Sequence, residues 1–153
     1  MRTLTFALGL ALVAGCAKEK PAIQAAAPPP PPPAAPAPIN LGVVAGDWTV
    51  TVTPAASDSV LVTYKLHATA ADTGWTITFP NRKPMAVQIT TMGDSIMTTM
   101  ATYESVLRKN TKVSVAGVMH LVNGQLVGTT TAHYTTTKAD SVVNLKMNGI
   151  KAP

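Results

Sequence analysis

The feature that most constrains the fold of this chain is a period-two alternation of apolar and polar residues throughout its larger, C-terminal part. Valine and threonine supply much of the pattern, and β-branched residues of this kind favour strands. Strict alternation places one set of side chains on each face of a half-buried strand. No segment of 41–153 has convincing helical periodicity. The pattern therefore predicts one all-β domain over 41–153.

Short turn-rich links separate the alternating segments, and Asn123-Gly124 is the strongest two-residue hairpin signal among them. Consecutive strands with short links favour a single up-and-down antiparallel eight-stranded barrel, because closure removes the edge strands that invite aggregation. A two-sheet β-sandwich is the alternative. The eight expected strands are 47–53, 59–69, 75–79, 85–90, 96–103, 113–121, 126–134 and 143–147.

The N-terminus has the composition of a secretory signal peptide over 1–15. Arg2 is its only charge, an apolar run follows over 4–13, and the small residues Ala14 and Gly15 precede Cys16. The apolar run is too short to be a stable membrane span, which needs about 20 residues. Cys16 is the only cysteine of the chain.

Val13-Ala14-Gly15-Cys16 resembles the lipobox of bacterial lipoproteins, whose usual form is Leu-(Ala/Ser)-(Gly/Ala)-Cys. The resemblance implies that Cys16 is lipidated and that the signal is cut just before it. Several acyl chains would hold the protein to a membrane without a spanning helix. Ala17 follows instead of Asp, which by the same resemblance favours the outer membrane, facing the periplasm. The alternative is an ordinary signal peptide with an unrelated cysteine.

The segment 16–40 is rich in proline and alanine and predicts a disordered stalk between the lipidated cysteine and the domain. Proline fixes φ and lacks an N–H, so such a run adopts extended polyproline II. Recognition by a proline-binding module is the alternative. A lipidated Cys16 would leave the domain without a thiol, which excludes disulfides, thiol catalysis and thiolate metal ligands.

The chain carries a formal net charge of +5, and its cations are scattered. The nearest approach to clusters is the pairs Arg82-Lys83 and Arg108-Lys109, both in expected loops. They are either weak attractors of anionic lipid heads or polysaccharide, or ordinary solubilising charge. Nucleic acid is not an expected partner of an exported lipoprotein.

No catalytic motif is present, and only Glu104 among the acids falls outside the stalk and the expected turns and strand starts. Three histidines can hold a zinc ion. His67, His120 and His133, however, fall on the polar phase of their strands and should point outward. In a hairpin centred on Asn123-Gly124, position 120 faces roughly 127, so His120 and His133 should not lie opposite each other. We therefore expect no metal, no cofactor and no enzymatic activity.

The inward phase of the strands contains five aromatic residues that are candidates for a ligand pocket. Pockets for small molecules are mostly apolar and aromatic, although the same side chains could simply fill the core. The segment 103–112 is the longest connection and the expected rim. The candidates are Trp48, Tyr64, Trp75, Phe79 and Tyr134.

Gly46-Asp47-Trp48 resembles the Gly-x-Trp motif of lipocalins, in which the tryptophan packs across the closed end of an eight-stranded barrel. Lipocalins carry a late arginine that stacks on this tryptophan, and the expected last strand offers Lys146 there. The resemblance implies an envelope lipoprotein that binds a small apolar ligand. The alternative is a non-enzymatic structural or protein-interaction module of the envelope with a filled core, whose protein partner the sequence does not indicate.

Overall fold

The computed structural model describes residues 37–137 and 139–153, so the expected signal peptide and Cys16 lie outside the described residues. The described chain opens with one turn of helix, α1 (Leu41–Val44). Asn40 caps it, because its side chain accepts a hydrogen bond from the Gly42 amide at 2.9 Å. A helix this short carries no periodic signal, and the sequence did not predict it. No helix in this part of the chain has the length and apolarity that a membrane crossing requires.

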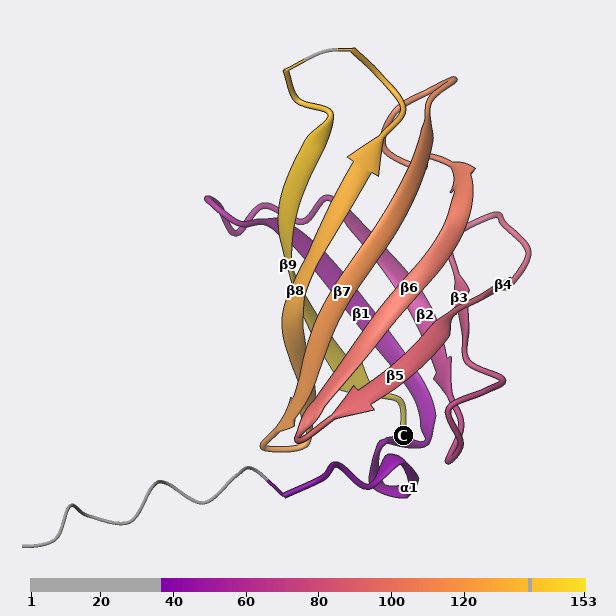
Figure 1. The fold of residues 1–153 in the computed structure, drawn as a ribbon, viewed down its shortest axis with the longest axis vertical. Helices are drawn as coiled ribbons and strands as arrows, with labels where there is room; N and C mark the ends of the chain where they lie inside the picture. Colours follow the sequence, from indigo (N-terminus) through magenta and orange to yellow (C-terminus); the bar gives the residue numbers. More distant parts are fainter. Residues whose placement is uncertain (1–36, 138) are drawn as a thin grey trace, which may run out of the picture. The chain divides into compact units, whose positions relative to one another are not determined.

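The strands form one antiparallel sheet in the order β4-β3-β2-β1-β9-β8-β7-β6-β5. Because β1 pairs with β9, the first and last strands lie side by side and the sheet curls into a nearly closed barrel (Figure 1). The barrel is therefore confirmed over the sandwich. The strands are β1 (Gly46–Pro54), β2 (Val62–Ala68), β3 (Thr76–Thr78), β4 (Met85–Ala86), β5 (Gln88–Met92), β6 (Ser95–Glu104), β7 (Lys112–Val122), β8 (Gln125–Tyr134) and β9 (Val142–Lys151).

The expected strand at 85–90 is interrupted at Val87, which turns eight expected strands into nine. β4 pairs with β3, whereas β5 pairs with β6, so this one stretch joins the two ends of the sheet. The Val87 amide donates to the Trp75 carbonyl at 3.0 Å instead of joining a ladder. The other seven expected strands are each present in chain order.

The expected strand at 59–69 begins later than predicted, at Val62. Val60 was expected to point inward, but it is 61% exposed. The chain first makes a loop after Pro54, and it rejoins β1 through a hydrogen bond from the Leu61 amide to the Val52 carbonyl. The alternation of apolar and polar residues therefore continues into the loop before Val62, although the strand itself begins only at Val62.

The hairpin between β7 and β8 follows the sequence prediction closely. Asn123 has φ of 51° and Gly124 has φ of 77°, the left-handed pair that a tight hairpin turn requires. The register places His120 opposite Val127, as expected from a pairing centred on this turn. The outward phase of His120 and the inward phase of Leu126 follow from that register.

The two ends of the barrel differ. At the closed end lie α1, the C-terminal end of the chain and the connections β2–β3, β5–β6 and β7–β8 (Figure 1). The buried side chains of Val44, Trp48 and Trp75 fill this end. The connections 55–61, 79–84 and 105–111 lie at the opposite, open end, together with the link between β8 and β9.

The wall of the barrel has a gap toward the open end, which we call the seam. Pairing of β2 with β3 stops at Lys65, so residues 62–64 of β2 have no strand on that side. Pairing of β5 with β6 stops at Thr99, so residues 100–104 of β6 also lack a partner there. Loop 79–84 crosses the opening between these two strand ends. The seam is therefore closed by side chains, without a hydrogen-bonded ladder.

Candidate functional site

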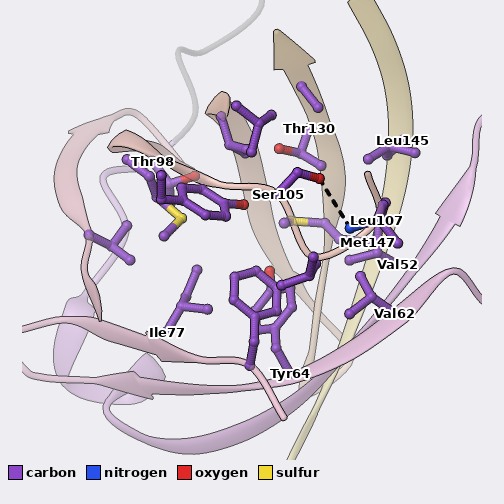
Figure 2. A pocket seen from close by; sticks show the side chains of 18 of the residues that line it. Val52, Val62, Tyr64, Ile77, Thr98, Ser105, Leu107, Thr130, Leu145 and Met147 are labelled. Carbon is purple, nitrogen blue, oxygen red and sulfur yellow. Dashed lines mark hydrogen bonds between the residues drawn. The ribbon is translucent and has the colours of Figure 1, made fainter. Parts of the chain in front are cut away.

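The barrel encloses an apolar cavity of about 60 Å³, counted as space open to the centres of water-sized molecules. Cores normally contain few voids larger than a water molecule. Side chains from both walls of the barrel converge on this space (Figure 2). The residues around it are Val52, Val62, Tyr64, Leu66, Ile77, Phe79, Val87, Thr98, Met100, Tyr103, Ser105, Val106, Leu107, Val113, Val115, Met119, Thr130, Ala132, Tyr134, Leu145 and Met147.

The structure divides the five predicted aromatic residues into two groups. Tyr64, Phe79 and Tyr134 line the cavity. Trp48 and Trp75 do not line it, although both are at least 98% buried. Each indole Nε1 donates at 2.8 Å to the backbone carbonyl four residues earlier in the chain. The tryptophans therefore close one end of the barrel, and the phenol and phenyl rings face the space above them.

Trp48 lies buried at the closed end of the barrel. Its indole donates to the Val44 carbonyl of α1. The cation beside it is Lys151, whose Nζ lies 5.5 Å from the centre of the ring, within cation–π range. The expected last strand ended at 147 and offered only Lys146, but β9 runs on to Lys151, which pairs with Trp48. Lys146 points outward and forms an ion pair with Asp58 at 3.1 Å.

Three buried hydroxyl groups give the cavity its polar points. Thr98 and Thr130 face inward on β6 and β8, and both donate to carbonyls of β7, at 3.5 Å to Gly117 and 3.0 Å to Ala116. Thr98 stands in phase with Ile96 and Met100, so alternation could have identified it. Thr130 is likewise in phase with Ala132. Because the threonine donors are satisfied, they add little polarity to the space.

Ser105 begins a loop that caps the open end. Its Oγ accepts a hydrogen bond from the Leu107 amide at 3.1 Å (Figure 2). It also accepts one from the Arg108 amide at 3.0 Å. Its own amide donates to the Thr111 carbonyl at 2.8 Å, which closes the loop at its base. Val106 and Leu107 line the cavity from this loop. The segment predicted as the rim is therefore a cap over the cavity, with Val106 half-buried and Leu107 40% exposed.

Tyr103 is a cavity residue that sequence reasoning missed as one. The pairing of β6 with β7 shifts between Met100 and Tyr103, which is the signature of a bulge. The extra residue returns Tyr103 to the inward face, three positions after Met100. Strict alternation places it outward, so no local pattern could have revealed it.

A row of aromatic rings closes the seam from inside. The Phe79 ring meets the Tyr64 ring of β2 edge-on at 5.3 Å between centres, and it stacks on the Tyr103 ring of β6 at 5.8 Å. Burial, and secondarily Tyr103, raises the pKa of Tyr64 well above its ordinary value. Burial, followed by Tyr134, raises the pKa of Tyr103 to about 12, against a lowering effect of Arg82. The phenols of Tyr64, Tyr103 and Tyr134 therefore face one region. Tyr64 and Tyr103 stay neutral at ordinary pH.

Two arginines flank this region from outside. Arg82 donates through Nη1 to the Glu104 carbonyl and through Nη2 to the Ser105 carbonyl at 3.2 Å. The Arg108 guanidinium lies 3.8 Å from the centre of the Tyr134 ring and pairs with Asp140 at 2.9 Å. Arg82 and Arg108, far apart in the sequence, thus both hydrogen-bond to Ser105, Arg82 through its side chain and Arg108 through its backbone amide.

The histidines point outward, as expected, and they do not assemble into a site. His67 pairs with Asp47 at 2.8 Å across β1 and β2. Ser95 Oγ lies 3.4 Å from His120 Nδ1, and Asp94 Oδ1 lies 3.6 Å from the same atom. A serine–histidine–aspartate relay needs its serine and its acid on different ring nitrogens. Within residues 37–137 and 139–153, no three His, Cys, Asp or Glu side chains gather as a metal site.

No known family model, curated protein or solved structure matches this chain. The cavity offers apolar contact and neutral hydroxyl groups. In the described part of the chain it presents neither a paired acid and base nor an activated nucleophile. An arrangement of this kind can bind and shield a molecule.

Proposed function

We propose that this protein is an exported, lipid-anchored envelope protein whose lipocalin-like barrel binds one small apolar molecule without catalysis. The observation that carries the proposal is the apolar cavity inside an otherwise packed barrel. Binding sites for small molecules are concave and mostly apolar, with few polar groups. The mixture of aromatic rings, aliphatic side chains and hydroxyl groups around this cavity fits that description.

The size of the cavity limits the ligand. An engineered cavity of about 150 Å³ binds benzene, and at 60 Å³ this cavity is well below that size. Drug-sized ligands occupy pockets of roughly 300–1,000 Å³. The bound molecule is therefore either very small, or it enters by displacing the cap that carries Val106 and Leu107. Besides hydrogen bonds within itself, the cap is held by side-chain contacts of Arg82 with the Ser105 carbonyl and of Arg108 with Asp140. Its movement would break those contacts and leave the strand ladders intact.

A filled-core interaction module is the second candidate function, and the small volume of the cavity favours it. The two proposals differ in one measurable property, the uptake of apolar molecules. For this test we choose the full chain with Cys16→Ser, because a chain without acyl groups needs no detergent, and detergent would compete for the cavity. The probes are toluene and N-phenyl-1-naphthylamine, both neutral and of different size.

Ligand binding predicts saturable, one-to-one uptake of toluene, with shifted nuclear magnetic resonance signals of the methyl groups of Met119, Leu145 and Val115. Both probes exceed the 60 Å³ of the closed cavity, so each enters only as the cap moves, and uptake of the larger naphthylamine should be slower. The native protein, extracted gently from its membranes, should carry a small molecule detectable by mass spectrometry. The binding proposal is lost if neither probe binds and the native protein carries none, and the filled-core module then remains.

The anchor is tested separately. The wild-type chain should partition with membranes and carry acyl mass on Cys16, whereas the Cys16→Ser chain should be found in the soluble fraction. The physical reason is that several acyl chains hold a protein stably, while the domain alone offers no comparable anchor. Membrane partition of the mutant, together with an unmodified wild-type N-terminus, contradicts the lipoprotein assignment.

A further inference from the structure

The open end of the barrel is electrically different from the closed end. Within the described residues, the open end carries six cations and three carboxylates, whereas the closed end carries Lys151 and three carboxylates. The open-end cations are Arg82, Lys83, Arg108, Lys109, Lys112 and Lys146, and its acids are Asp58, Glu104 and Asp140. An anion approaching the barrel is therefore attracted toward the entrance of the cavity.

Arg82 is the best placed of these cations, because it lies across the seam. Its loop leaves the barrel after Phe79, which packs between Tyr64 and Tyr103 inside. Its guanidinium then reaches the carbonyls of Glu104 and Ser105 on the other side of the opening. Arg82 thus spans the one part of the wall that has no strand ladder, directly outside the aromatic row that lines the cavity.

Arg82 also keeps binding capacity for an anion. A guanidinium has five N–H donors, and two of them account for the described hydrogen bonds. Both of those acceptors are neutral carbonyls, and no described carboxylate forms an ion pair with Arg82. Arg108, in contrast, is already neutralised by Asp140. The half-buried position of Arg82 strengthens its interaction with an incoming anion relative to one at a fully exposed cation.

We propose that the ligand is an amphiphile with a single anionic head, and that Arg82 binds this head at the seam while the apolar part enters the cavity and widens it by displacing the cap. This inference rests on the proposed binding of an apolar molecule and names its chemical class. The planar fork of arginine suits both carboxylate and phosphate. Tyr103, neutral and adjacent, supplies a further hydroxyl for the same head. The aromatic row offers the path for the tail, because rings move more readily than paired strands.

The test compares octanoate with octanol, which have tails of equal length and differ in the charge of the head. The protein is the full Cys16→Ser chain, and the affinities are measured by isothermal titration calorimetry. Octanoate should bind roughly ten-fold more tightly or better, the value of a charge-assisted hydrogen bond. The preference should shrink as salt is raised. Octyl phosphate, measured alongside, distinguishes a phosphate head from a carboxylate head.

Arg82→Gln should abolish the preference for octanoate and leave octanol binding nearly unchanged. Lys83→Gln is the matched control, since it removes the same charge one residue away from an exposed side chain. If the Arg82→Gln variant also loses octanol binding, the Arg82→Lys variant is measured next, because lysine retains the positive charge. Restored preference in that variant supports the subsite, and its absence overturns it.

Other outcomes separate this inference from the function on which it rests. Equal binding of octanol and octanoate, or a preference that survives Arg82→Gln, overturns the anionic subsite while ligand binding stands. Failure of toluene, octanol and octanoate alike overturns the proposed function itself. Loss of preference in Lys83→Gln of the same size as in Arg82→Gln shows diffuse attraction by the open end, and it also overturns the subsite.

Discussion

Ala132 offers the sharpest test of the cavity as real space in the barrel. It is 97% buried on β8, between Val115 of β7 and Val143 of β9, and its methyl group lines the cavity. Ala132→Val adds two carbon atoms that can enter this space. Valine is also well suited to a strand. The substitution should therefore stabilise the folded protein instead of overpacking it.

The size of the effect follows from the cavity. An unfilled void in a core costs about 24 cal/mol per Å³, so 60 Å³ corresponds to about 1.4 kcal/mol of lost stability. This is the largest gain that complete filling could yield. The two added carbons provide about 0.8 kcal/mol each when buried, which is a similar amount. For a domain of this size the melting temperature would rise by roughly 5 °C.

The free energy of unfolding is measured by urea titration, and toluene binding is measured on the same samples. Ala116→Val is the matched control, because Ala116 is exposed on β7 and reports only the strand preference of valine. We expect Ala132→Val to gain stability beyond the control and to lose toluene binding. Overpacking costs about 1–3 kcal/mol. Destabilisation of that size, or unchanged toluene binding, refutes a usable cavity at this position.

Two further predictions concern the walls of the barrel and its phenols. A Cβ on Gly128 would lie 2.0 Å from the Val118 carbonyl oxygen, so Gly128→Ala should cost roughly 1–3 kcal/mol or more in urea titration. Unchanged stability would mean that β7 and β8 are not so close. The pKa of Tyr103 is raised to about 12. The stability that the neutral, buried phenol contributes should therefore be fully present below pH about 10 and be lost as the pH rises toward 12, because the phenol of the unfolded chain ionises first. Tyr103→Phe should reduce this loss without abolishing it, because the pKa of Tyr64 is also raised by burial, and a Tyr103 phenol that ionises near its ordinary value in the folded protein contradicts the burial.

The candidate site was only partly predictable. The inward phase of Tyr64, Phe79 and Tyr134 was readable from alternation, because period two assigns a face to each residue of a regular strand. The alternation does not show how far along the barrel, between its closed and open ends, an inward-facing residue lies. Trp48 and Trp75 therefore looked equivalent to the tyrosines, although they lie at the closed end and do not line the cavity.

Two residues central to the proposals carried no local signal of their role. Tyr103 reaches the cavity through a bulge, which reverses the phase that alternation assigns to it. Arg82 appeared as a solvated loop cation beside Lys83. Its position became visible only when loop 79–84 was found to cross the seam and reach Glu104 and Ser105, more than 20 residues away in the chain.

The sequence by itself determined the all-β class, the phase of most strands and the tight turn at Asn123-Gly124. These properties are local, since they depend on neighbouring side chains and on the backbone freedom of single residues. Only the tertiary structure decided that β1 meets β9, that a seam remains near the open end, and that a cavity survives between the packed rings. Those properties depend on distances between residues far apart in the chain, which no local pattern encodes.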